Sequence, residues 1–167
     1  QTCVAPDYVL VHEDAKEELI QQMAKAIKDF YSDKPIQSPD FARIINAKHF
    51  NRLRTMLLPE HIRVGGHIDA DNLYIAPTVL DNLTWEHPAM QEEIFGPILP
   101  VLSFSNTAEA IKMINRHEKP LALCLFTNNQ ECQEQILKQV AFGGGCINDT
   151  LVHLGNPRLP FGGVGES

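Results

Sequence analysis

Short apolar runs alternate along the chain with amphipathic segments, and this alternation limits the possible fold more than any other feature of the sequence. The apolar runs are predicted strands and cover residues 4–11, 73–80, 98–104, 121–126 and 146–148. Helices are predicted between them, beginning after Asp14, Asn46, Asn106 and Asn128. Strands that alternate with helices are typical of α/β proteins, in which helices cover a mostly parallel sheet.

The first predicted helix has the most clearly defined start and apolar face. Asp14 and Glu17 have the spacing of a capping box, and the helix is predicted to run to about residue 31. Its apolar face consists of Leu19, Met23, Ile27 and Phe30. Asn128 and Glu131 have the same spacing at the start of the last predicted helix, which the glycines at 143–145 are expected to end.

Composition excludes several functional classes. The chain has 167 residues, of which 44% are hydrophobic and 21% charged, which is enough for one domain with a substantial core. The formal net charge is −7 and there is no basic block, so nucleic acid is not an expected partner. No apolar run approaches the roughly 20 residues that a membrane-spanning helix needs.

The cysteines and histidines show no metal-binding pattern. The four cysteines, at positions 3, 124, 132 and 146, include no C-x-x-C pair, and no Cys/His spacing matches a zinc site. We therefore predict no metal site, and four free thiols favour a reducing, cytoplasmic location. The seven histidines are expected on the surface or at helix caps, and Cys124 and Cys132 are expected to pack as small apolar residues.

Three segments could carry chemistry, and local pattern leaves each of them open. Cys3 is predicted at the edge of a strand, where it is either a packing residue or a nucleophile. The stretch MQEEIFGPILP at 90–100 is either a helix end with a turn or a carboxylate that accepts hydrogen bonds from a ribose, with an aromatic beside a flat ring. GGGCINDTLVH at 143–153 and the following LPFGGVGES read as a turn and a loop, and neither G-x-G-x-x-G nor a P-loop is present.

Taken together, these segments resemble the aldehyde dehydrogenase superfamily, in particular its class 3 and fatty aldehyde dehydrogenase branch. The motifs that carry the resemblance, in the family's order, are QTCVAPDYVL, RIINAKHFNRL, YIAPTVL, MQEEIFGPILPV, EKPLAL, GGGCINDTLVH and LPFGGVGES. The resemblance implies a three-layer α/β/α catalytic domain that occupies residues 1–167. The chain begins without Met and stops inside a glycine-rich loop, so we interpret it as a piece of a larger protein.

The resemblance also implies roles for five residues. Cys3 matches the catalytic nucleophile, Glu93 the residue that binds the nicotinamide ribose, and Phe95 the aromatic beside the nicotinamide. Asn148 matches a position near the catalytic centre, and Phe161 an aromatic that lines the aldehyde pocket. The implied reaction is the oxidation of an aldehyde to a carboxylic acid with NAD or NADP, through a cysteine thiohemiacetal and thioester.

The family's layout further implies that the dinucleotide-binding domain, the general-base Glu of E-L-G-G-K and the oxyanion-binding Asn lie upstream of this chain, and that a C-terminal tail follows it. We therefore expect the isolated chain to have little activity and the parent protein to be a homo-oligomer, either a dimer or a tetramer. Two alternatives remain open at this stage: a Cys-dependent acyl hydrolase that uses Cys3 with a histidine, and a non-catalytic interaction lobe.

Overall fold

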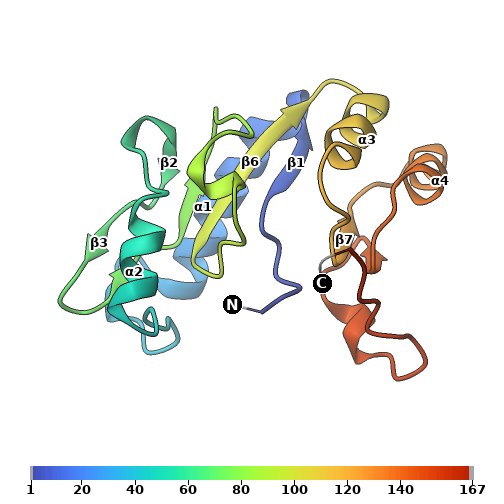
Figure 1. Cartoon of the computed structure of the whole chain (residues 1–167). Helices are drawn as coiled ribbons and strands as arrows, with labels where there is room; N and C mark the ends of the chain where they lie inside the picture. Colours follow the sequence, from blue (N-terminus) through green and yellow to red (C-terminus); the bar gives the residue numbers. More distant parts are fainter. Residues whose placement is uncertain (1, 166–167) are drawn as a thin grey trace. The chain divides into compact units, whose positions relative to one another are not determined.

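The computed structural model describes residues 2–165, which form two compact units. Unit 1 contains residues 6–103, and unit 2 contains residues 104–165 together with Thr2–Ala5. Within the described residues, no helix has the length and apolar character that crossing a membrane requires. Helices and strands follow one another in both units, so the predicted α/β class is confirmed (Figure 1).

Unit 1 is built on a four-stranded sheet with the order β1-β6-β5-β2, whose strands are Val9–His12, Ile98–Phe104, Thr78–Leu80 and Ile62–Val64. β5 pairs with β6 in parallel and with β2 antiparallel. A separate antiparallel pair joins β3 (Ile68–Asp69) to β4 (Tyr74–Ile75). The four-stranded sheet is therefore mixed, whereas a mostly parallel sheet was expected.

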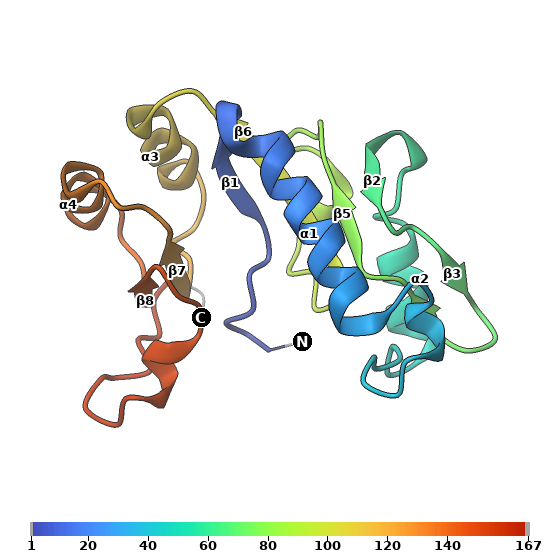
Figure 2. The same ribbon diagram turned by 180° about the vertical axis from the view of Figure 1, so that it is seen from behind.

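Helix α1 (Lys16–Tyr31) covers one face of the four-stranded sheet, as Figure 2 shows from behind. Ile20 of the helix packs with Val79 of β5 and Val101 of β6, and all three side chains are buried. The predicted capping box is wrong, because His12 instead caps a 3-10 turn, Glu13–Ala15, that precedes α1. Phe30 was expected on the apolar face but is 74% exposed.

The opposite face of β5 is also buried. Thr78 and Leu80 alternate with Val79 along the strand, and all three residues are at most 2% exposed, so both faces of β5 are covered. Helix α2 (Ala47–Arg54) contacts β4 and contributes the buried Phe50 and Leu53 to the core. Its predicted N-cap is confirmed, because the Asn46 side chain accepts a hydrogen bond from the His49 backbone N–H.

The predicted strand at 73–80 is two strands in different sheets. Pro77, which lacks a backbone N–H, separates β4 from β5, and the chain changes its pairing partner there. Short 3-10 helices at Pro35–Gln37, Pro59–His61 and Pro88–Met90 each begin with proline. Such a start suits the fixed φ of proline and leaves no helical donor unpaired.

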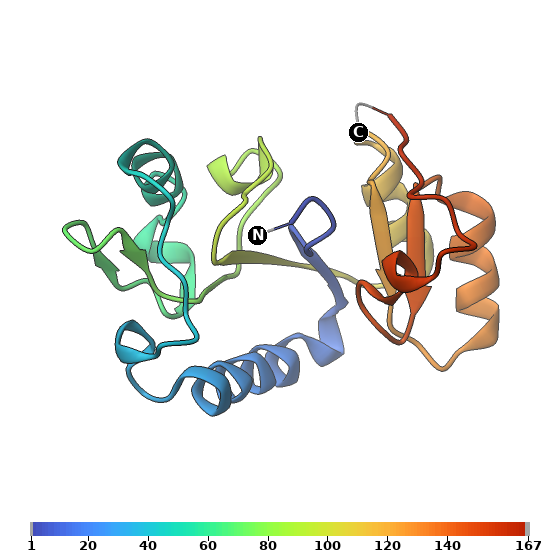
Figure 3. The same ribbon diagram turned by 90° about the horizontal axis from the view of Figure 1, so that it is seen from below.

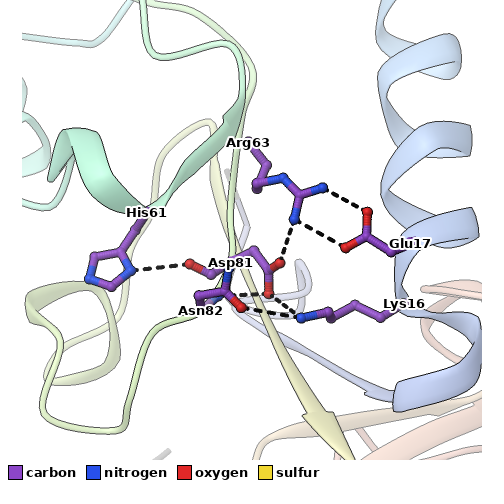
Figure 4. A network of polar contacts seen from close by, with 6 residues as sticks. All are labelled: Lys16, Glu17, His61, Arg63, Asp81 and Asn82. Atoms are coloured by element: carbon purple, nitrogen blue, oxygen red, sulfur yellow. Dashed lines mark hydrogen bonds and ion pairs between the residues drawn. The ribbon is translucent and has the colours of Figure 1, made fainter.

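A network of charged side chains joins α1 to the end of β5 in unit 1 (Figure 4). Asp81 is 2% exposed, and its carboxylate pairs with Lys16 at 3.2 Å and with Arg63 at 2.8 Å. The Arg63 guanidinium also forms a bidentate ion pair with the Glu17 carboxylate of α1, with N–O distances of 3.1 and 2.7 Å. These hydrogen bonds hold the pKa of Glu17 below its ordinary value and that of Arg63 above it.

Unit 2 contains a parallel strand pair, β7 (Ala122–Leu125) and β8 (Gly144–Ile147), with two helices. Ile111 of α3 (Thr107–Asn115) and Ile136 of α4 (Gln130–Gln139) share a buried cluster that also includes Val140 and packs against β7. The orange α4 lies beside the strand pair in Figure 3. The predicted cap of α3 by Asn106 is confirmed, whereas α4 is capped one residue later than predicted, by Asn129.

A 3-10 helix at Val152–Gly155 follows β8. Its His153 is only 8% exposed, and neither of its ring nitrogens has a hydrogen-bond partner among the described residues. His87 of unit 1 is 5% exposed and accepts a hydrogen bond from the Ala89 backbone N–H. The histidines were predicted to lie on the surface or to cap helices. His87 is buried but does cap a 3-10 helix, whereas the buried His153 does neither, so the prediction is wrong for His153.

Candidate active site

Cys3 lies on an exposed turn of unit 2 rather than at the edge of a strand. The turn spans Thr2–Ala5 and is closed by a 3.1 Å hydrogen bond from the Ala5 backbone N–H to the Thr2 carbonyl. Val4 is only 5% exposed and anchors the turn, while Cys3 beside it is exposed. The first strand begins only at Val9, so the predicted strand edge at Cys3 is wrong. The turn presents the Cys3 sulfur to solvent.

The other three cysteines are half-buried and have neighbours. Cys146 and Cys124 are paired residues of β8 and β7, with their sulfurs 3.7 Å apart, and the Cys146 sulfur lies 2.9 Å from the Asp149 carbonyl. Burial, followed by the Cys124 thiol, raises the pKa of Cys146 above its ordinary value. Cys132 accepts a 3.6 Å hydrogen bond from the Thr107 hydroxyl. These contacts make Cys3 the most accessible thiol of the four.

We therefore predict that a limiting amount of iodoacetamide at neutral pH alkylates Cys3 ahead of the other three cysteines. Exposure favours reagent access at Cys3, and the raised pKa of Cys146 depletes its reactive thiolate. Peptide mass spectrometry against time measures the four rates in one sample. Modification of Cys146 before Cys3 would contradict the assignment of Cys3 as the available thiol.

Glu93 and Phe95 lie on a loop of unit 1 between the 3-10 helix at Pro88–Met90 and β6. Both side chains are exposed, and no hydrogen bond or ion pair within residues 2–165 occupies the Glu93 carboxylate. Ile94 between them is 1% exposed and anchors the loop in the core. A free carboxylate next to a displayed aromatic ring suits a ligand that carries vicinal hydroxyls and a flat ring, so these residues fit the nicotinamide riboside half of a dinucleotide.

The backbone of this loop is constrained. Phe95 has φ of 48°, in the left-handed region that bulky residues rarely adopt. The Ile94 backbone N–H donates a 3.0 Å hydrogen bond to the Asp7 carboxylate, and Arg52 of α2 donates to the carbonyls of Glu93 and Ile94 at 3.1 and 2.6 Å. Burial raises the pKa of Asp7, an effect that the Ile94 hydrogen bond opposes and that the nearby negative charge of Glu93 reinforces.

Asn148 follows β8 with φ of 56°, a conformation that asparagine tolerates better than most residues. Its side-chain oxygen accepts a 2.9 Å hydrogen bond from the Thr127 backbone N–H, and its side-chain nitrogen donates to the Thr127 carbonyl at 3.2 Å. Its backbone N–H donates to the Leu125 carbonyl. The Asn148 amide therefore ties the end of β8 to the chain after β7, and its role near a substrate stays a prediction.

Phe161 is 56% exposed and lies on a loop that runs against the start of β8. A Cβ added at Gly143 would lie 2.0 Å from the Gly162 carbonyl oxygen, and one at Gly144 would lie 2.8 Å from the His153 ring. Only glycine permits such close contacts at positions 143 and 144. The glycine-rich stretch therefore forms the start of β8 and packs directly against the loop that carries Phe161. The expectation of a plain turn at these glycines is wrong.

The five predicted site residues fall in both units. Cys3, Asn148 and Phe161 belong to unit 2, whereas Glu93 and Phe95 belong to unit 1. That these two groups act on one substrate stays a prediction. Sequence reasoning missed Asp7 and Arg52, which hold the loop of Glu93. A signal existed, because both residues lie inside motifs that carry the family resemblance, QTCVAPDYVL and RIINAKHFNRL.

Comparison with known proteins agrees with these features. The sequence model described as "Aldehyde dehydrogenase family" matches residues 1–167, so the chain belongs to the aldehyde dehydrogenase family. Over the whole chain, it is 50% identical to 4,4'-diaponeurosporen-aldehyde dehydrogenase of Staphylococcus aureus and 49% identical to aldehyde dehydrogenase family 3 member B1 of Rattus norvegicus. These relatives confirm the predicted resemblance to the class 3 branch.

A similar solved structure is the substrate-bound state of Staphylococcus aureus AldH, which is 50% identical with a TM-score of 0.95. The match covers 99% of this chain and 36% of that one. The two curated relatives are covered over 37% and 36% of their lengths. The chain therefore spans little more than a third of the proteins that it resembles.

Proposed function

We propose that the protein oxidises an aldehyde to a carboxylic acid with NAD or NADP, and that Cys3 is its nucleophile. The observation that carries this proposal is the exposure of the Cys3 thiol on an anchored turn, in a chain whose whole length matches the aldehyde dehydrogenase family. The substrate class follows from the names of the relatives, each of which is called an aldehyde dehydrogenase. The particular aldehyde does not follow from them.

The residues of this chain account for several parts of the reaction. The Cys3 thiolate adds to the aldehyde carbonyl and holds its carbon as a thiohemiacetal, and the Cys3 backbone N–H is a candidate donor to the new oxyanion. When bound, NAD(P)+ supplies the hydride acceptor. Oxidation leaves a thioester on Cys3, which water hydrolyses to the carboxylic acid. In this proposal Glu93 accepts hydrogen bonds from the ribose hydroxyls, Phe95 packs beside the nicotinamide, and Asn148 and Phe161 border the aldehyde.

For the cofactor the proposal includes both NAD and NADP, and for the assembly it includes both a dimer and a tetramer. One relative, from Rattus norvegicus, is named dimeric and NADP-preferring and is 43% identical, whereas a solved structure from Sinorhizobium meliloti is named NAD-dependent and is 26% identical. These names support either cofactor, and the first supports the proposal of a homo-oligomer, a dimer or a tetramer. The cytoplasmic location and the assignment of residues 1–167 to one catalytic domain stay predictions.

The test is a comparison of two polypeptides, the full-length protein that carries this chain and residues 1–167 alone. Absorbance measures the formation of reduced cofactor in the presence of an aldehyde. We expect the full-length protein to form reduced cofactor, and we expect residues 1–167 alone to form almost none. Rapid aldehyde oxidation by residues 1–167 would show that the cofactor site has been misplaced. Ester cleavage that needs a histidine and no nicotinamide would favour the acyl hydrolase instead, and no turnover of either kind would favour the interaction lobe.

A further inference from the structure

Ile94 is fixed from three directions in unit 1. Its side chain is 1% exposed, its backbone N–H donates to Asp7 at 3.0 Å, and its carbonyl accepts from Arg52 at 2.6 Å. A residue held by packing and by both of its backbone polar groups has little freedom to rotate. The backbone of Glu93 and Phe95, on either side of Ile94, is therefore held in a fixed orientation.

Arg52 binds the loop through both arms of its guanidinium group. Nη2 donates to the Ile94 carbonyl, and Nη1 donates to the Glu93 carbonyl at 3.1 Å and lies 3.4 Å from the Glu92 carboxylate. The side chain is 24% exposed, so solvent competes only partly for these bonds. The planar guanidinium presents its N–H donors to two successive carbonyls in a fixed arrangement, whereas the ammonium of lysine is a compact group whose donors rotate freely on a flexible stem.

The loop beyond Ile94 rests on the same helix. Leu53, the residue after Arg52 in α2, is fully buried, and a Cβ added at Gly96 would lie 2.6 Å from one of its methyl carbons. Gly96 therefore lets the backbone approach α2 closely. Phe95 lies between two fixed residues, which explains how its left-handed φ of 48° is maintained while its ring stays 43% exposed.

We propose that Asp7 and Arg52 are positioning residues that hold Glu93 and Phe95 in the orientation that binds the nicotinamide riboside half of the cofactor. This inference rests on the proposed function. Asp7 follows Cys3 by only four positions in the sequence. The segment that carries the proposed nucleophile therefore also carries one of the two residues that hold the loop of Glu93 and Phe95. Neither residue needs to touch substrate or cofactor.

The experiment uses the full-length protein with Arg52→Ala, Asp7→Ala and, as the matched control on the same helix, the exposed Arg54→Ala. Misplacement of a reacting group by about 1 Å can cost about 100-fold, so Arg52→Ala and Asp7→Ala are each expected to lower kcat/KM for NAD(P)+ by about 10- to 100-fold. The KM for NAD(P)+ should rise more than the KM for the aldehyde. Arg54→Ala should stay close to wild type.

Two conservative variants separate positioning from a general loss of structure. Asp7→Asn keeps an oxygen that can accept from Ile94 and should recover most of the loss, whereas Arg52→Lys keeps the charge but not the fork and should not. The alkylation rate of Cys3 should be unchanged in all variants that stay folded. Unchanged cofactor parameters in Arg52→Lys and Asp7→Ala would overturn the inference. A wild-type protein that neither binds NAD(P)+ nor oxidises aldehydes would instead overturn the proposed function.

Discussion

Replacement of Cys3 by alanine is expected to lower aldehyde oxidation by the full-length protein by at least about 10⁴-fold, the scale on which removal of a covalent nucleophile acts. Without the sulfur, no thiohemiacetal or thioester forms, and the remaining groups can only bind the reactants. Cys3→Ser should be nearly as inactive, because a hydroxyl is far less ionised than a thiol at neutral pH. Steady-state rates of reduced-cofactor formation measure the effect.

Cys132→Ala is the matched control for this prediction. Cys132 lies on α4 in the same unit, and it is half-buried against Thr107 rather than exposed on a turn. Its removal should leave the rate of oxidation close to that of wild type. Equal losses in the Cys3 and Cys132 variants would point to damaged structure and would argue against a special role for Cys3.

Replacement of Asp81 by alanine is expected to lower the free energy of unfolding of unit 1 by about 3 kcal/mol, at the low end of the range for breaking a buried ion pair. The loss leaves the charges of Lys16 and Arg63 facing a buried site without their carboxylate (Figure 4). The low end applies because the side chain of Arg63 is 35% exposed and can turn toward water.

Urea unfolding followed by the fluorescence of Trp85 measures this change. Trp85 is the one tryptophan of residues 1–167 and lies in unit 1, where its ring centroid is 5.3 Å from that of Tyr8. Asp71→Ala removes an exposed carboxylate of the same unit and should have little effect. Asp81→Asn should fall between the two, since it keeps an acceptor but not the charge. A shift for Asp81→Ala no larger than that of Asp71→Ala would show that the network contributes nothing to stability.

Two helix caps that depend only on neighbouring residues were predictable from the sequence, whereas the capping box predicted at Asp14 and Glu17 did not form. Asn46 and Asn106 cap helices where the spacing indicated, because an N-cap bond spans only three residues. Elements that depend on distant partners were not. The stretch at 73–80 reads as one strand, and only its separate pairings with β3 and with β6 show that it is two.

The candidate site divides in the same way. Cys3, Glu93 and Phe95 were proposed as site residues from motifs that resemble a known family, because local pattern alone did not assign them. Asp7 and Arg52 were missed because their contacts with Ile94 join positions 87 and 42 residues apart. His153 is likewise buried against Gly144, which is nine positions away in the sequence and lies next to it only in the folded chain. Such long-range contacts leave no periodic signal in a single sequence.

Acid quenching during turnover identifies the residue that carries the acyl group, which we propose is Cys3. The full-length protein is mixed with an aldehyde and NAD(P)+, quenched in acid within the first turnover, digested and analysed by mass spectrometry. We expect the acyl adduct on the peptide that contains Cys3 and no adduct in the Cys3→Ala protein. An adduct on any other residue, or undiminished oxidation by Cys3→Ala, would show that the Cys3 sulfur is not the nucleophile.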